Sequence, residues 1–161
     1  MSQYKFEIIP LESVGPVKLG TSKKETRRIL KGTGMSPTTR SENEDSCSDH
    51  GFGISYTDGD EDTAQVYAVE LTNNLPNNPI KAMFQGKDLF EISYEECRQH
   101  LLEFYSFKPT YDEFSELSFS ELDMILSKMD HMMKYLHKGH FNILSIGDGD
   151  PDYWNLRLGN I

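Results

Sequence analysis

The sequence predicts an α+β protein in which two tandem repeats, each a helix followed by antiparallel strands, share one core. Two observations favour this fold class: similar helix starts recur at an offset of 71 residues, and strand patterns broken by an acidic turn follow each start. We expect one sheet with the helices on one face. The 161 residues fit a single domain, 1–161, built of repeats at about 1–76 and 77–161. Apolar residues make up 37% of the chain and aromatic residues 11%, which is enough to bury a core.

The two helix starts share a Ser-x-x-Glu motif. This motif predicts a capping box, in which the Ser oxygen accepts from the third amide and the Glu carboxylate accepts from the cap amide. The two segments are identical at only four of 14 positions, which also arises by chance. The repeat hypothesis therefore rests on the shared capping motif and on the strands that follow each helix. The pairs matched at this offset are Ser22 and Ser93, Glu25 and Glu96, Arg27 and Arg98, and Leu30 and Leu101.

The first half then alternates between turn signals and strand signals. Gly32 and Gly34 end the helix, and a polar loop is expected from Ser36 to His50. Strands are predicted at 52–57 and 65–71, joined by the acidic turn 58–62. The Asn- and Pro-rich run 73–79 marks the midpoint.

The second half repeats this order with one ambiguous stretch. A short strand at 80–84 precedes the second helix. Residues 117–136 fit a strand to about Leu126 and a short helix at about 128–138, which we favour, but they also fit one continuous helix. A strand at 140–146 and an acidic turn at 147–151 follow, before Tyr153 and Trp154.

No motif of catalysis stands out, so we expect a protein that is not an enzyme, with no catalytic residue and no cofactor. The chain has no Gly-x-Ser-x-Gly, no Cys-x-x-Cys and no phosphate-binding glycine loop. An alternative function is metal binding or small-molecule sensing, because two short spacings resemble those of zinc ligands. The residues concerned are Cys47, His50, His137 and His140. A scaffold protein without a defined partner is a further alternative.

The charge balance favours a basic protein partner. The net charge of −10 should repel nucleic acid and anionic membranes and attract basic surfaces. No apolar run is long enough to cross a bilayer, no secretory signal is apparent at the start, and two cysteines suit a reduced compartment. We therefore expect a cytoplasmic protein.

Acidic residues gather where the partner is expected to bind. Residues 41–62 hold eight acids and no Lys or Arg, whereas residues 17–31 hold six bases. A solvated surface with local pairing would also explain this pattern. Opposite charge accelerates protein association, and aromatic residues anchor interfaces. The predicted partner-binding residues lie in and beside the two acidic turns: Asp58, Asp60, Glu61, Asp62, Asp148, Asp150, Asp152, Tyr153 and Trp154.

Several segments resemble a group of small uncharacterised bacterial proteins. Residues 14–30 (VGPVKLGTSKKETRRIL) resemble their opening, xGPxxxGMSxxEVxxxLG, and similar elements recur at 52–56, 84–90 and 140–147. Thr21 and Thr26 depart from the usual Met and Val, and Lys31-Gly32 replaces the plain Leu-Gly ending. Some of these proteins look like immunity or antitoxin partners of secreted toxins, and the repeat architecture resembles the β-lactamase-inhibitor protein. The resemblance implies an immunity protein that neutralises a basic toxin domain by covering its active site.

Overall fold

The computed structural model describes residues 4–73, 80–106, 108–113, 116–127, 140–141 and 143–147. The chain begins with β1 (Tyr4–Ile9), β2 (Ser13–Val14), β3 (Val17–Lys18), α1 (Lys23–Gly32), β4 (Thr38–Ser41), β5 (Glu44–Cys47), the 3-10 turn η1 (Ser48–His50), β6 (Phe52–Tyr56) and β7 (Val66–Thr72). It continues with β8 (Ile80–Phe84), β9 (Lys87–Asp88), α2 (Tyr94–Phe104), β10 (Tyr111–Glu113), β11 (Glu116–Phe119), the 3-10 turn η2 (Ser120–Leu122), β12 (Met124–Ser127) and β13 (Ile143–Gly147). The predicted α+β class is confirmed.

The strands form two sheets, not the single sheet that we predicted. A five-stranded sheet has the order β3-β2-β1-β8-β9, and an eight-stranded sheet has the order β10-β11-β12-β13-β7-β6-β5-β4. The two segments that precede the helices, β1 and β8, pair with each other in parallel instead of joining the larger sheet. Every pairing within the larger sheet is antiparallel.

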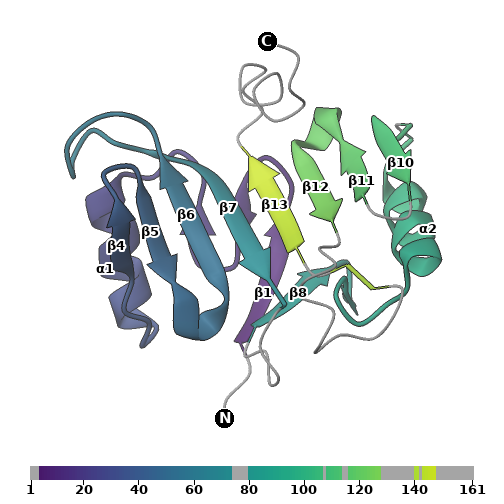
Figure 1. The fold of residues 1–161 in the computed structure, drawn as a ribbon, viewed down its shortest axis with the longest axis horizontal. Helices are drawn as coiled ribbons and strands as arrows, with labels where there is room; N and C mark the ends of the chain where they lie inside the picture. The colour runs from purple at the N-terminus through teal and green to yellow at the C-terminus, as the bar shows by residue number, and fades with distance from the viewer. Residues whose placement is uncertain are drawn as a thin grey trace.

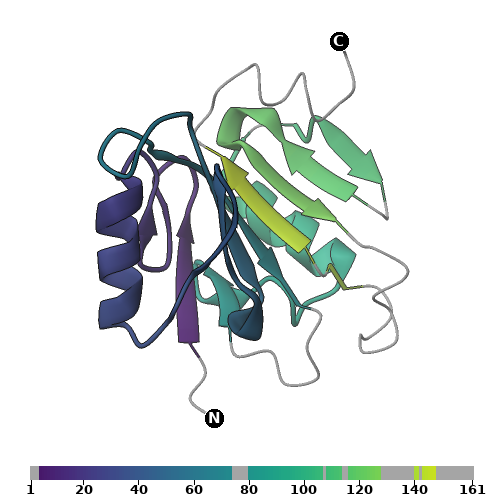
Figure 2. The same cartoon turned by 60° about the vertical axis from the view of Figure 1, so that its left-hand side comes forward.

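Both helices and the smaller sheet lie on the same side of the eight-stranded sheet (Figures 1 and 2). We call this side of the large sheet the inner face and the opposite side the outer face. Apolar side chains on the inner face, such as Phe52, Ile54 and Leu144, belong to one buried cluster with Phe6 of β1 and Leu101 of α2. In the part of the chain that the structure describes, neither helix has the length and hydropathy of a membrane-spanning segment.

Both helices begin where their serines predict. Ser22 and Ser93 are the N-caps, and each side chain accepts a hydrogen bond from the third amide of its helix. The full capping box forms at α2, where the Glu96 carboxylate accepts from the Ser93 amide at 2.9 Å. At α1 the carboxylate of Glu25 instead accepts from the Arg28 guanidinium, at 2.5 and 2.7 Å. The capping box predicted for the first helix is therefore formed only in its serine half.

Two stretches were predicted wrongly in detail. Residues 36–50, expected to be a loop, form the hairpin of β4 and β5 and the turn η1. Their polar sequence hides a strand pair because the inward residue Asp45 is buried by pairing with α1. The expected strand up to Leu126 is two strands, β11 and β12, joined by η2 and by Asp123 in a left-handed conformation (φ 44°). The helix expected at about 128–138 lies outside the described residues.

Candidate functional site

The acidic loop between β6 and β7 packs on the first turn of α1. The Lys23 amide donates to the Ala64 carbonyl at 2.8 Å, and the Lys24 amide donates to the Glu61 carbonyl at 2.9 Å. These bonds satisfy amides that a helix start leaves without an internal partner. Main-chain hydrogen bonds therefore fix the loop to the helix independently of its side chains.

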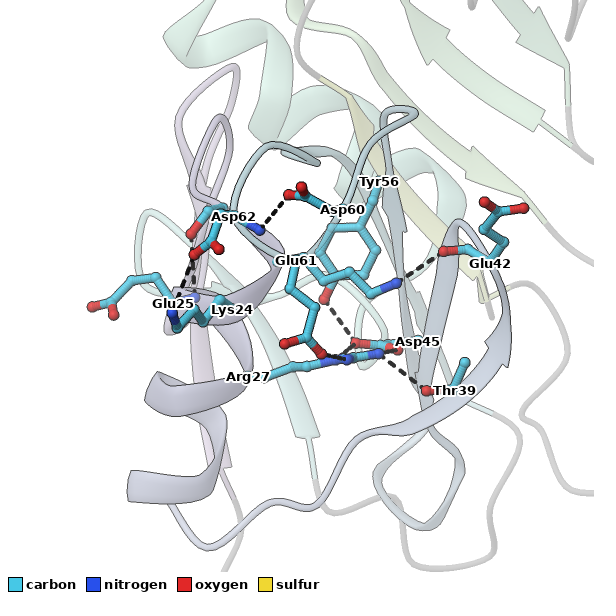
Figure 3. A network of polar contacts seen from close by, with 12 residues as sticks. Lys24, Glu25, Arg27, Thr39, Glu42, Asp45, Tyr56, Asp60, Glu61 and Asp62 are labelled. Carbon is cyan, nitrogen blue, oxygen red and sulfur yellow. Dashed lines mark hydrogen bonds and ion pairs between the residues drawn. The ribbon is translucent and has the colours of Figure 1, made fainter.

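All four acids predicted in this loop make contacts within the chain, and the partner of Asp58 lies in the turn between β4 and β5. Asp62 pairs with Lys24 at 3.2 Å, and Glu61 pairs with Arg27 at 2.7 Å. The Asp60 carboxylate accepts from the main-chain amide and the hydroxyl of Thr63 and from the Asp62 amide, which holds the pKa of Asp60 below its usual value. Figure 3 shows these side chains gathered above the start of α1.

A buried ion pair lies beneath this loop. The Arg27 guanidinium donates two hydrogen bonds to Asp45, both of 2.8 Å, and donates further to Glu61 and, at 3.0 Å, to the hydroxyl of Thr39. Asp45 is 1% exposed and also accepts from the buried Tyr56 hydroxyl at 2.9 Å. The network thus ties α1 to β4, β5 and β6 (Figure 3).

The ionisation states of this pair follow from their surroundings. Burial alone would raise the pKa of Asp45, but the hydrogen bonds from Arg27 and Tyr56 outweigh it, and the pKa is lowered. The hydrogen bond to Asp45 raises the pKa of Arg27. Burial, reinforced by the adjacent carboxylate, raises the pKa of Tyr56. Asp45 is therefore a carboxylate near neutral pH, and Tyr56 is a neutral donor to it.

The turn between β4 and β5 is linked to the loop. The Asn43 amide group donates to Asp58 at 2.8 Å, and the Tyr56 amide donates to the Asn43 carbonyl at 2.8 Å. The Lys23 ammonium donates to the Glu42 carbonyl at 2.9 Å and lies 5.3 Å from the centre of the Tyr56 ring. The two segments therefore form one exposed edge, which we call the acidic rim. Its carboxylates belong to Glu42, Glu44, Asp58, Asp60, Glu61 and Asp62.

The second helix makes a related contact. Arg98 pairs with Asp112 of β10 at 2.7 Å, and the Tyr94 hydroxyl donates to the same carboxylate. Burial would raise the pKa of Asp112, but these two hydrogen bonds lower it. This pair is more exposed than Arg27 and Asp45, so solvent screens it more strongly.

The remaining predicted residues fare differently. Asp148, Asp150, Asp152, Tyr153 and Trp154 lie outside the described residues, as does His137 of the metal alternative. Within the described residues, no group of three or more His, Cys, Asp or Glu side chains is placed to hold a metal ion.

The other three residues proposed as metal ligands, Cys47, His50 and His140, are buried or contact neighbouring groups of the chain. Cys47 is buried, and this burial raises the pKa of its thiol to about 12. His50 packs edge-on against Tyr4, and a ring nitrogen of His140 lies 3.0 Å from the Phe90 carbonyl.

Sequence reasoning missed the buried centre of the network, Asp45 and Tyr56. Asp45 is one of eight acids in a polar run, and nothing in its immediate sequence distinguishes it. The available signal was Arg27, a helix residue matched by Arg98 in the second helix. Its partner could not be deduced because the hairpin was not predicted.

Comparison with protein-family models, with curated proteins and with solved structures finds no match to this chain.

Proposed function

We propose that this chain is a non-catalytic binding protein that recognises a basic protein partner, in the cytoplasm, through its acidic rim. Within that class we favour an immunity protein that neutralises a toxin domain by covering its active site. A toxin that acts on nucleic acid must present basic side chains to phosphate, so an acidic inhibitor is complementary to it.

The observation that carries the proposal is the fixed shape of the rim. Two segments that are separate in the sequence are joined by the Asn43–Asp58 hydrogen bond and are anchored to α1 by Arg27 and Lys24. A rim that is ordered before binding loses less conformational entropy when a partner docks. Its excess of carboxylates, in a chain of net charge −10, supplies the field that attracts a basic partner.

The tandem-repeat hypothesis belongs to the same proposal. Each half runs as a longer strand, a short strand segment (β2 and β3 in the first half, β9 alone in the second), a helix and four antiparallel strands. The turns η1 and η2 start at Ser48 and Ser120, 72 residues apart, and each ends at a left-handed residue, Gly51 and Asp123. Arg27 and Arg98, from matched helix positions, each bind a carboxylate of the hairpin that follows. We infer two copies of one unit, as the likeness to the β-lactamase-inhibitor protein implies.

The first experiment is a pull-down with the tagged chain from lysate and culture of its source, followed by binding kinetics with the retained protein. A stoichiometric basic partner is expected. Absence of any basic protein, with a bound metal in elemental analysis, would instead favour the metal-binding alternative through Cys47, His50, His137 and His140.

The rim itself is tested by charge reversal at Glu42, whose side chain forms no ion pair among the described residues and does not hold the rim together. The Glu42→Lys variant should reduce the association rate several-fold at low salt and weaken its salt dependence. The matched control Glu91→Lys changes the net charge equally, but beside α2. Equal losses in both variants would show that net charge alone, without the rim, determines association.

A further inference from the structure

Gly53 occupies a position that the fold alone does not explain. It lies in the middle of β6, a central strand, where its neighbours Phe52 and Ile54 are buried on the inner face. Its φ lies outside the left-handed range, and a Cβ built on it would come no closer than 3.7 Å to its nearest neighbour, the Asp45 carbonyl oxygen. Glycine weakens a strand interior and often marks a bulge, a tight bend or a place where a ligand or another backbone approaches closely. The register of β6 against β7 shifts between Ser55 and Tyr56, so Gly53 itself lies in the regular part of the strand.

The missing side chain leaves a hollow on the outer face. Gly53 pairs with Ser46 on one side and with Glu70 on the other, and the adjacent row contains Glu44, Ser55 and Ala68. Gly53 and Ser55 of this surface line a hollow of about 90 Å³, together with Arg40, Glu44 and Glu70 among others. The two helices lie on the opposite side of the sheet (Figures 1 and 2).

The hollow is acidic overall. The charged side chains on its outer side are two carboxylates, Glu44 and Glu70, and one guanidinium, Arg40. Asp45 also lines the hollow, but its carboxylate is bonded to Arg27 on the inner face. Glu70 lines the hollow and also accepts a hydrogen bond from the Ser145 hydroxyl of β13 at 3.4 Å, on the side of β7 away from Gly53. Among the described residues, neither Glu44 nor Arg40 forms an ion pair.

We propose that this hollow receives an arginine or lysine side chain of the basic partner. The apolar stem lies over Gly53, and the cationic head faces the carboxylates of Glu44 and Glu70. The inference rests on the proposed function and deepens it, because it extends the binding surface from the acidic rim onto the outer face of β5, β6 and β7. Charge complementarity identifies the occupant, and the absent side chain at Gly53 provides the space.

The test fills the hollow without changing any charge. A hexa-arginine peptide serves as the probe, and its binding is followed through the backbone amide signals of the full chain by NMR. We expect the signals of Gly53, Ser55 and Glu70 to shift. The Gly53→Thr variant should weaken binding about tenfold while its melting temperature stays the same or rises, because threonine favours strands. The matched control Gly32→Thr fills open space at the end of α1 and should leave binding unchanged.

A second variant keeps the proposal falsifiable if Gly53→Thr disturbs the sheet. Arg40→Gln removes the one cation of the hollow and should strengthen peptide binding by a few fold. Unchanged affinity in both variants, or shifts confined to the loop at 57–65, would overturn the inference. The proposed function fails separately, if the pull-down retains no basic protein. A retained partner that binds Gly53→Thr as tightly as the wild type would refute only the hollow.

Discussion

The Asp45→Ala substitution tests whether the ion pair of buried Asp45 with partly buried Arg27 holds the candidate site together. It removes the acceptor of three hydrogen bonds, two from Arg27 and one from Tyr56. The buried Tyr56 hydroxyl would lose its partner, at a cost of about 1–3 kcal/mol. Arg27 would lose two charge-assisted bonds, but its side chain is 22% exposed and keeps Glu61 and Thr39, so we assign about 2 kcal/mol to it. The expected loss in unfolding free energy is about 3–5 kcal/mol, as for other buried pairs that lose one partner.

Urea denaturation of the wild type and the variant measures this loss directly. For a chain of this length, it corresponds to a fall in melting temperature of about 6–20 °C. The Asp112→Ala variant is the matched control in the second half, and its more exposed pair should contribute only about 0–1 kcal/mol. A loss below about 1 kcal/mol for Asp45→Ala, or equal losses in the two variants, would refute the reasoning that burial makes the first pair structural.

Three further predictions concern acid, helix capping and the thiols. The pKa values of Asp45, Asp60 and Asp112 are lowered in the folded chain, so the stability they contribute is complete above the unfolded pKa and is lost as the pH falls through the folded values. Urea denaturation should therefore show that the free energy of unfolding declines below about pH 4, and that the decline is smaller in Asp45→Asn. Glu96→Ala removes half of a capping box and should lower the urea midpoint of unfolding, whereas Glu25→Ala removes only an exposed pair and should lower it less. Burial raises the pKa of the Cys47 and Cys97 thiols to about 12, so alkylation by iodoacetamide at pH 8 should require unfolding; rapid labelling of the native chain, followed by mass spectrometry, would contradict their burial.

Local signals in the sequence predicted local structure well. Serine caps, the glycines after the first helix and the runs of β-branched and aromatic residues gave both helix starts and the strands β6, β7 and β8 within a residue or two. These signals succeed because capping and turn chemistry depend on neighbours in the chain. The hairpin of β4 and β5 was missed because its burial depends on Arg27, which lies 18 residues away from Asp45. Polar strands of this kind give no apolar alternation to detect.

The candidate site was predictable in composition but not in the roles of its residues. The acidic turn at 58–62 was recognised, and the structure places it at an exposed edge. Charge counting could not show that Glu61 and Asp62 neutralise bases of α1, or that Asp60 stabilises its own loop. Each of these three acids therefore has an internal partner, which charge counting did not indicate, and their contact with a binding partner stays a prediction. Glu42 and Glu44 form no ion pair among the described residues, and both lie in the run that was predicted to be a loop.

The two arginines give a physical reason for the difference between the halves. Each helix must hold the hairpin that follows it, and each does so with an arginine and a carboxylate. In the first half the carboxylate is on β5 and buried, and in the second it is on β10 and partly exposed, while Leu117 of β11 is fully buried in apolar contact. The first hairpin therefore depends on α1 for the partner of its buried carboxylate, whereas β11 of the second hairpin is buried by apolar contact. The rim lies mostly on the connections between strands of that half, and the hollow over Gly53 lies on the strands themselves. The geometry of both therefore depends on Arg27, even though Arg27 faces the other side of the sheet from the hollow.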